Sequence, residues 1–290
     1  MNIDQLMAGS IDLHVHCAPD GFEERRVDAL QLAQQAIEYG MKHVVVKSHQ
    51  FCSAPMAAMV NKAVNQPVLI GSLVLNDCAG GLNPEAVKVA AKEGAKIIWM
   101  PTTSARSHIE ARSRRKDANN AQAAPQGISV IDKDGNLVPE VHQILDIIKA
   151  ENLVLATGHI SATEIIAIAN EARKRGVKTI LTHLITKGFG HTFPVETAVE
   201  LAQKGAFVEF CFNLCLPPGR MTPADFVENI KILGADHCVL STDLGQPQNP
   251  FPAEGFRMAL TQMIRAGLSE NEVEKLVKIN PEKLLFSKSE

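Results

Sequence analysis

The sequence predicts an α/β protein, a (β/α)8 (TIM) barrel with a long loop and hairpin inserted after the fourth strand. Eight short β-branched runs alternate with stretches of helical periodicity. Five expected helices are each followed by a glycine that precedes the next strand, where a left-handed cap is favoured. The length of 290 residues fits one barrel of about 250 residues with additions, so we expect a single domain over residues 1–290.

The expected strands are apolar on both faces, as parallel strands covered on both sides are. They occupy residues 10–16, 42–48, 67–75, 95–101, 152–158, 177–183, 206–212 and 237–243. Eight similar strand-then-helix units favour a closed barrel over an open, doubly wound sheet. No GxGxxG or GxxxxGK[ST] motif follows the first strand, which also weakens a nucleotide-binding open sheet.

The expected helices lie between the strands, near residues 27–39, 55–65, 84–93, 139–150, 162–175, 195–204, 223–233 and 253–266, with a C-terminal helical region in 268–290. Capping signals support these limits. Asn83 precedes Pro84 at a helix start, and Ser161 and Ser269 each precede a glutamate by three residues, which is a capping box.

Residues 102–139 interrupt this alternation and contain no long helical signal. Within them, 127–140 is expected to form a hairpin that turns at Asp134-Gly135. The preceding segment 105–117 carries a net charge of +3. This insertion is either a solvated surface loop or a lid that recruits an anionic substrate.

Composition excludes several classes of protein. The net charge of −3 gives no reason to expect nucleic-acid binding, and no apolar run is long enough to span a membrane. The first ten residues lack the features of a signal peptide. Six scattered cysteines without a CxxC pair are typical of reduced thiols, so we expect a cytoplasmic protein without disulfides. Separately, we expect its partner to be a small-molecule substrate. Homo-oligomerisation is left open.

Polar side chains gather where the expected strands end. His14 and His16 stand one residue apart, so on a strand they point to the same side, about 6.5–7 Å apart, with Asp12 expected below them on that side. The other strand ends carry Lys47 and His49, His159, His183, and Asp243. Burying such groups costs several kcal/mol each unless they are paired or bind a metal, and imidazoles and carboxylates suit Zn²⁺. Active sites of these barrels lie at the carboxyl ends of the strands.

This order of residues resembles the metal-dependent amidohydrolase superfamily over residues 10–245, with "DLHVH" and "STD" as the nearest local matches. The chain looks like a little-characterised branch of it. The resemblance implies that His14, His16 and Asp243 hold one divalent ion, that His159 and His183 hold a second, and that a hydroxide bridges them. Zinc is expected, although manganese, iron and nickel share this ligand chemistry.

The sequence departs from the superfamily at the fourth strand. Binuclear members usually place a bridging carboxylated lysine or a glutamate there, whereas this strand ends in "IIWMPTT". Lys47 could bridge two ions as a carbamate, because burial and a nearby metal both lower the pKa of a lysine. Alternatively, Lys47 stays charged and binds substrate beside a single ion, or His49 is the ligand from the second strand.

The implied reaction is hydrolysis of a C–N, C–O or P–O bond, with Asp243 as the proton acceptor and His183 or His159 polarising the scissile bond. We expect His49, Arg106 and His191 to contact substrate. Glu209 is expected to face inward and to orient a ligand or the substrate. The cysteines near strand ends (Cys17, Cys52 and Cys215) are not expected to be nucleophiles, and there is no GxSxG motif.

Three alternatives remain at this point. A mononuclear enzyme on the same barrel would decarboxylate or hydrate a small acid, with an unmodified Lys47. A catalytically silent barrel would bind a ligand or partner without holding a metal tightly. A phosphoesterase of the other histidine-rich barrel family would need more ligands at the ends of strands two to four than "GSLVLND" and "IIWMPTT" supply.

Overall fold

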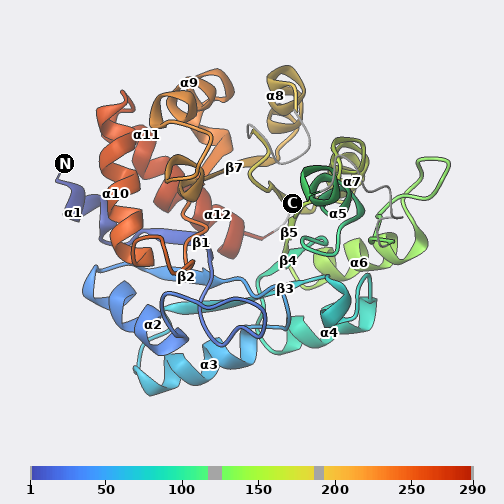
Figure 1. Ribbon diagram of the computed structural model, residues 1–290, viewed down its shortest axis with the longest axis horizontal. Helices are drawn as coiled ribbons and strands as arrows, with labels where there is room; N and C mark the ends of the chain where they lie inside the picture. The colour runs from blue at the N-terminus through green and yellow to red at the C-terminus, as the bar shows by residue number, and fades with distance from the viewer. Residues whose placement is uncertain (1, 117–125, 186–192, 289–290) are drawn as a thin grey trace.

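A computed structural model describes residues 2–116, 126–185 and 193–288. Eight parallel strands lie side by side in chain order at the centre of the molecule, surrounded by helices (Figure 1). The strands are β1 (Ile11–Val15), β2 (His43–Val46), β3 (Leu69–Val74), β4 (Ile97–Trp99), β5 (Val154–Ala156), β6 (Lys178–Leu181), β7 (Phe207–Cys211) and β8 (Cys238–Ser241).

The first and last strands meet and close the barrel. Val15 and Leu244 form a parallel bridge. The amide of His16 donates to the carbonyl of Leu244 at 2.7 Å, and the amide of Asp243 donates to the carbonyl of His14 at 2.8 Å. The predicted (β/α)8 barrel is therefore confirmed, and its closure brings the two ends of the predicted ligand set together.

Helices follow the strands as expected, within one to three residues at most ends. They are α1 (Ile3–Met7), α2 (Ala29–Glu38), α3 (Ala54–Ala63), α4 (Pro84–Lys92), α5 (Arg106–Lys116), α6 (Pro139–Ala150), α7 (Ala162–Lys174), α8 (Val195–Gln203), α9 (Pro223–Leu233), α10 (Pro252–Arg265), α11 (Glu270–Glu274) and α12 (Asn280–Phe286). A π-helical segment, Lys275–Ile279, joins the last two. Short 3-10 turns lie at Asp77–Ala79 (η1), Phe212–Cys215 (η2) and Ala235–His237 (η3).

The predicted capping signals act as expected. Asn83, Ser161 and Ser269 each accept a backbone hydrogen bond at the start of their helices. All five glycines between helix and strand have positive φ (Gly40, Gly94, Gly176, Gly205 and Gly234).

Two apolar clusters separate the inside of the barrel from its outer layer. Ile11, Leu13, Val45 and Trp99 belong to the interior cluster, which also includes Leu284 and Leu285 of α12. The helix α12 therefore covers the amino ends of the strands. The carboxyl ends, where the polar residues lie, form the opposite end of the barrel.

The expected orientation of Asp12 is wrong. In β1, three residues from Asp12 to Val15 span the same length as two in β2, which is a β-bulge. Asp12 pairs with Val44, which faces the helices, and its carboxylate accepts from the hydroxyl of Thr242 at 2.6 Å and from two backbone amides. Burial raises the pKa of Asp12 to about 7 despite these hydrogen bonds. The extra residue shifts the alternation and directs His14 inward.

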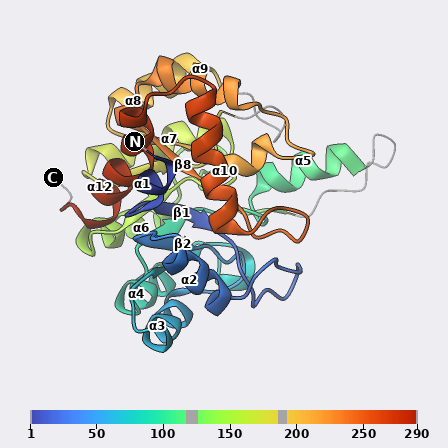
Figure 2. The ribbon, with the colours of Figure 1, turned by 90° about the vertical axis from the view of Figure 1, so that its left-hand side faces the viewer.

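The insertion after β4 differs from the expectation because it contains the helix α5. In Figure 2 this helix extends from the barrel toward the right of the view. Its sequence is polar all round, so apolar periodicity gave no signal; its first turn is fixed instead by the Arg106 amide donating to the Ile128 carbonyl and by the Ser107 hydroxyl donating to the His159 carbonyl. The hairpin turn is present at Gly135, but only Ile131 and Leu137 pair across it.

All six cysteines are free. No helix in the described parts of the chain combines the length and the apolar character needed to cross a bilayer.

Candidate metal centre at the carboxyl ends of the strands

His14, His16 and Asp243 converge at the carboxyl mouth of the barrel. Asp243 Oδ1 lies 3.1 Å from His14 Nε2 and 3.0 Å from His16 Nε2. Asp243 has a positive φ of 51°, and its second oxygen accepts from Asn213 Nδ2 at 2.8 Å. Burial alone would raise the pKa of Asp243, but the two histidines outweigh this and hold it well below its usual range. An ionised carboxylate therefore faces the two imidazoles.

Glu209 of β7 determines which nitrogen of His14 faces this carboxylate. Both oxygens of Glu209 lie 3.3 Å from His14 Nδ1, and neither side chain is exposed. An ionised carboxylate only accepts hydrogen bonds, so Nδ1 carries a proton, and Nε2 is the nitrogen that faces Asp243 and can bind an ion once it has released its own proton. The expectation that Glu209 faces inward is confirmed, and its contact is with a predicted ligand.

The donor set fits a divalent cation. His14 Nε2, His16 Nε2 and Asp243 Oδ1 lie within 4.8 Å of one another, and all three atoms can offer lone pairs to the same point. Burial lowers the pKa of His16 to about 4, so this imidazole is neutral, and its Nδ1 has no hydrogen-bond partner among the described residues. Two imidazoles and a carboxylate are a common zinc ligand set.

A second compact group, His14, Glu209 and Cys211, offers a poorer site. It would use His14 Nδ1, which already faces Glu209, and Cys211 Sγ lies 3.7 Å from the same nitrogen. Burial raises the pKa of the Cys211 thiol well above its usual range, so the sulfur keeps its proton.

Lys47 lies beside the same centre. Its Nζ is 3.0 Å from His14 Nε2 and 4.5 Å from the ring centre of Trp99, and the residue is only 1% exposed. Burial lowers the pKa of Lys47, although Asp243 and Glu209 oppose this. Trp99 ends β4, so the amine of Lys47 and the face of an indole occupy this part of the site.

His159 and His183 form a neighbouring pair, with ring centres 4.9 Å apart. The ring centre of His183 also lies 6.4 Å from that of His14, and burial lowers the pKa of His183 to about 4. His159 Nδ1 lies 3.1 Å from His108 Nδ1 of α5. Gly158 has φ 62°, and a Cβ there would lie 2.3 Å from the carbonyl oxygen of Met100, so only glycine lets the chain place His159 at this point.

A cavity of about 400 Å³ opens beside these histidines. It is lined by Glu23, His49, Thr103, His108, Ala111, Arg112 and His159. His108 and Arg112 are four residues apart on α5 and so share one face of it. Arg106, the predicted substrate contact, is exposed and is not among the lining residues, and His191 lies outside the described residues.

His108 and Asn213 were not expected from the sequence, and Arg112 was expected only as one of the basic residues of segment 105–117. Spacing by four within 105–117 was the available signal for His108 and Arg112, but it has meaning only on a helix, which was not expected there.

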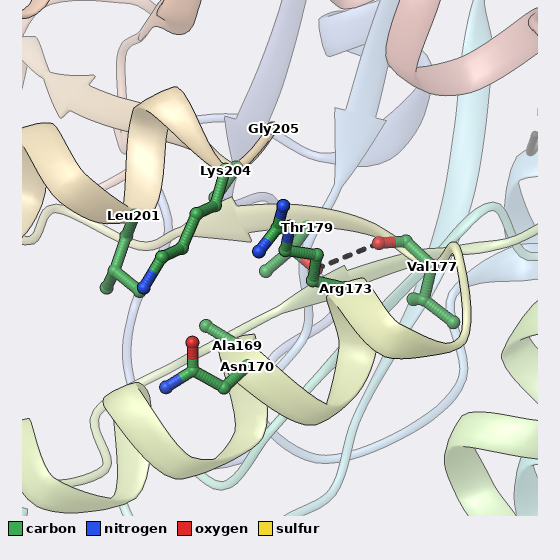
Figure 3. A pocket seen from close by; sticks show the side chains of 9 residues that line it. Ala169, Asn170, Arg173, Val177, Thr179, Leu201, Lys204 and Gly205 are labelled. Carbon is green, nitrogen blue, oxygen red and sulfur yellow. Dashed lines mark hydrogen bonds between the residues drawn. The ribbon is translucent and has the colours of Figure 1, made fainter.

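A small cavity of about 30 Å³ lies at the opposite end of the barrel (Figure 3). Arg173 and Lys204 border it, and Val177 and Ala206, which line it, directly precede β6 and β7. It is far from the histidines and contains no group of candidate ligands.

Comparison with known proteins places the sequence in a family. A family model described as "Family of unknown function (DUF6282)" matches residues 9–209. The chain belongs to the DUF6282 family. No curated protein matches the sequence.

Solved structures share the fold of this DUF6282 protein. An amidohydrolase from Pseudomonas aeruginosa is 14% identical with a TM-score of 0.61, and the match covers 98% of each chain. A probable 2-pyrone-4,6-dicarboxylic acid hydrolase from Acinetobacter baumannii, solved with citric acid bound, is 11% identical (TM-score 0.61; 96% of this chain and 99% of that one). An organophosphorus hydrolase from Deinococcus radiodurans is 15% identical (TM-score 0.59; 99% and 94%). These neighbours are amidohydrolase-superfamily barrels, so the expected resemblance in fold is confirmed.

Proposed function

We propose that this DUF6282 protein is a metal-dependent hydrolase that cleaves a C–N, C–O or P–O bond in a small anionic substrate. The observation that carries the proposal is the convergence of His14 Nε2 and His16 Nε2, both buried, on the half-buried Asp243 Oδ1 at 3.1 and 3.0 Å. Imidazole nitrogens and a carboxylate oxygen this close together in a largely buried site are costly unless protons or a cation pair them.

Two of the three proposed ligands, His14 and Asp243, are oriented by a neighbouring polar side chain. Glu209 holds His14, Asn213 holds Asp243, and the bulge in β1 places both histidines of the HxH pair on the inner side. Such supporting contacts raise metal affinity because they fix ring orientation and tautomer. When bound, a divalent ion at these residues would acidify a water molecule and polarise the bond to be broken.

Asp243 is the proposed proton acceptor. Its carboxylate is ionised, it faces both the metal ligands and the mouth of the barrel, and it can take a proton from the attacking water and pass it to the leaving group. The adjacent His183 is neutral and can orient the scissile group by a hydrogen bond.

We further propose that His159 and His183 hold a second ion, bridged to the first by a carbamate on Lys47. The low exposure of Lys47 and its lowered pKa favour the neutral amine that carbamate formation requires. A charged ammonium 3.0 Å from His14 Nε2 would instead repel a cation at this nitrogen.

The anionic character of the substrate rests on Arg112. This guanidinium borders the cavity and has no ion-pair partner in the described parts of the chain, whereas the other charged lining residue, Glu23, pairs with Arg25 at 3.2 Å. A carboxylate or phosphate would complete its hydrogen bonds. The name of the Acinetobacter baumannii neighbour makes lactones with carboxylate groups the first compounds to test.

A mononuclear enzyme that decarboxylates or hydrates a small acid is the second candidate. The observation that favours it is that, among the described residues, both compact groups of ligands include His14 and neither includes His159 or His183.

Metal analysis of the purified protein tests the proposal. We would measure metal per chain for the native protein, His14→Ala, Asp243→Asn and Lys47→Ala, with the exposed Lys62→Ala and the remote His237→Ala as matched controls. Two equivalents that fall in all three site variants support the binuclear hydrolase. One equivalent that persists in Lys47→Ala favours the mononuclear candidate.

Absence of a tightly bound metal after growth with zinc would contradict both enzyme proposals and favour a ligand-binding barrel. As a second test of the hydrolase proposal, activity is assayed on lactones, N-acyl amino acids and phosphoesters. Loss of turnover in Asp243→Asn with unchanged activity in His237→Ala is the expected result.

A further inference from the structure

His49 lies between the candidate metal centre and the cavity. Its ring stacks beside His16 with centres 4.8 Å apart, and it borders the cavity together with His159. Its Nδ1 lies 2.8 Å from the hydroxyl oxygen of Thr102. Its Nε2, at the other side of the ring, has no hydrogen-bond partner among the described residues. The direction of the hydrogen bond at Nδ1 therefore decides what His49 offers to the cavity.

Asn76 fixes this direction from a distance. Its Oδ1 accepts from the backbone amides of Thr102 at 2.8 Å and Ser104 at 3.2 Å. Its Nδ2 donates to the backbone carbonyl of His49 at 3.0 Å. Backbone amides only donate and carbonyls only accept, so the side-chain amide of Asn76 has one possible orientation.

The same Nδ2 of Asn76 lies 2.8 Å from the hydroxyl oxygen of Thr102 and must donate to it. Thr102 is fully buried, and its only other side-chain contact in the described parts of the chain is His49 Nδ1. An unpaired buried hydroxyl proton would cost about 1–3 kcal/mol. The hydroxyl therefore donates to His49 Nδ1, which is unprotonated, so the ring proton is on Nε2.

We infer that His49 is a fixed, neutral hydrogen-bond donor that binds an oxygen atom of the substrate's scissile carbonyl or phosphoryl group through Nε2–H, and that it is not a metal ligand. The inference rests on the proposed hydrolase function for the identity of that oxygen. The contacts from Asn76 to Thr102 and from Thr102 to His49 support the other part of the inference, which is the position of the proton on the ring of His49.

The chemistry of such a donor suits this position. A neutral N–H beside the metal ligands stabilises negative charge that develops on oxygen, without the repulsion that an imidazolium would exert on a nearby cation. Because the Nε2 atom carries its proton, it has no lone pair for an ion, which removes the reading of His49 as the ligand from the second strand. Asn76 and Thr102 are then positioning residues that act through His49.

Nuclear magnetic resonance of the protein labelled with ¹⁵N-histidine tests the inference directly. Long-range ¹H–¹⁵N correlations show which ring nitrogen carries the proton, and His49→Gln identifies the signal of His49. We expect a proton on Nε2 and none on Nδ1 between pH 6 and pH 8, before and after zinc is added. A proton on Nδ1, a doubly protonated ring, or loss of the Nε2 proton on adding zinc would overturn the inference.

Two variants of Thr102 separate the positioning role from general damage to the fold. Thr102→Val keeps the shape but removes the hydroxyl, and we expect His49 to become a mixture of both tautomers while the signal of the remote His237 is unchanged. Thr102→Ser restores the hydroxyl and should restore the single tautomer. An unaltered tautomer in Thr102→Val would contradict the proposal that Asn76 and Thr102 set the tautomer of His49.

These outcomes are independent of the proposed function. A protein that binds no zinc but shows the Nε2–H tautomer would contradict the hydrolase proposal and still support the control of the His49 tautomer by Asn76 and Thr102. A protein that binds zinc through His49 would do the opposite.

Discussion

His14 and Glu209 face each other inside the barrel, with His14 Nδ1 3.3 Å from both carboxylate oxygens of a residue 195 positions away. They come from β1 and β7, which are not adjacent strands, so only a closed barrel brings them together. The contact fixes the tautomer of His14 and directs Nε2 to Asp243. A carboxylate that supports a histidine ligand is a common arrangement around zinc.

Glu209→Gln should therefore weaken metal binding although Glu209 is not a proposed ligand. We expect affinity for zinc to fall about 10–100-fold, because the uncharged amide polarises His14 less and holds its ring less firmly. Competition with a chromophoric chelator measures this loss. The exposed Glu228→Gln serves as the matched control, and equal affinities in the two variants would show that Glu209 does not support the site.

Metal removal should lower thermal stability. An ion present at about 100 times its dissociation constant stabilises the folded state by about 2.7 kcal/mol. For a chain of this size that corresponds to a shift in Tm of about 4 °C, measured by scanning calorimetry before and after dialysis against a chelator. His14→Ala should melt at one temperature with or without chelator. A native protein whose Tm ignores the chelator would argue against a resident ion.

Affinity for the ion should rise with pH and then level off. The pKa of His16 is lowered to about 4 by burial, so no proton competes at this ring near neutral pH. For His14, burial lowers the pKa, but Asp243 and Glu209 outweigh it and raise it above 6.5. Below that raised pKa the ion must displace a proton from Nε2, so affinity increases about tenfold per pH unit and is constant above it.

Zinc titrations from pH 5.5 to 8.5 measure this dependence. A limiting slope of one proton is expected on the acid side. A slope of two would mean that a second imidazole, His16 first of all, is protonated before the ion binds. A flat profile would mean that no proton leaves His14 when the ion binds, which contradicts the raised pKa of His14.

Local rules predicted the barrel because each unit repeats the same signals. Apolar runs marked the eight strands, and glycines such as Gly176 and caps such as Ser161 marked the helix limits. The helix α5 escaped because it has no apolar face, and the tertiary contacts of Arg106 and Ser107 hold its first turn. The bulge in β1 was not predicted because an extra residue in a strand leaves no local pattern in "IDLHVH".

The candidate site was predictable where it follows strand ends and not where it depends on shape. His14, His16, Lys47, His183 and Asp243 were expected together because parallel strands end at one mouth. The contacts that orient them were not, because Asn76, Thr102 and Asn213 are ordinary polar residues whose role comes from the direction of their hydrogen bonds. That direction depends on packing between segments distant in sequence.

Arg112 and Arg106 provide a matched pair for testing how the cavity recognises its ligand. Both are exposed arginines on α5, but only Arg112 lines the cavity. We expect Arg112→Gln to weaken binding of glutarate about tenfold, because a charge-assisted hydrogen bond to a carboxylate is lost, and Arg106→Gln to leave it unchanged. Saturation-transfer NMR with glutarate, and with the uncharged glutaramide as a second probe, measures both. Equal binding of the two probes by the native protein, or equal loss in the two variants, would show that Arg112 does not select an anion.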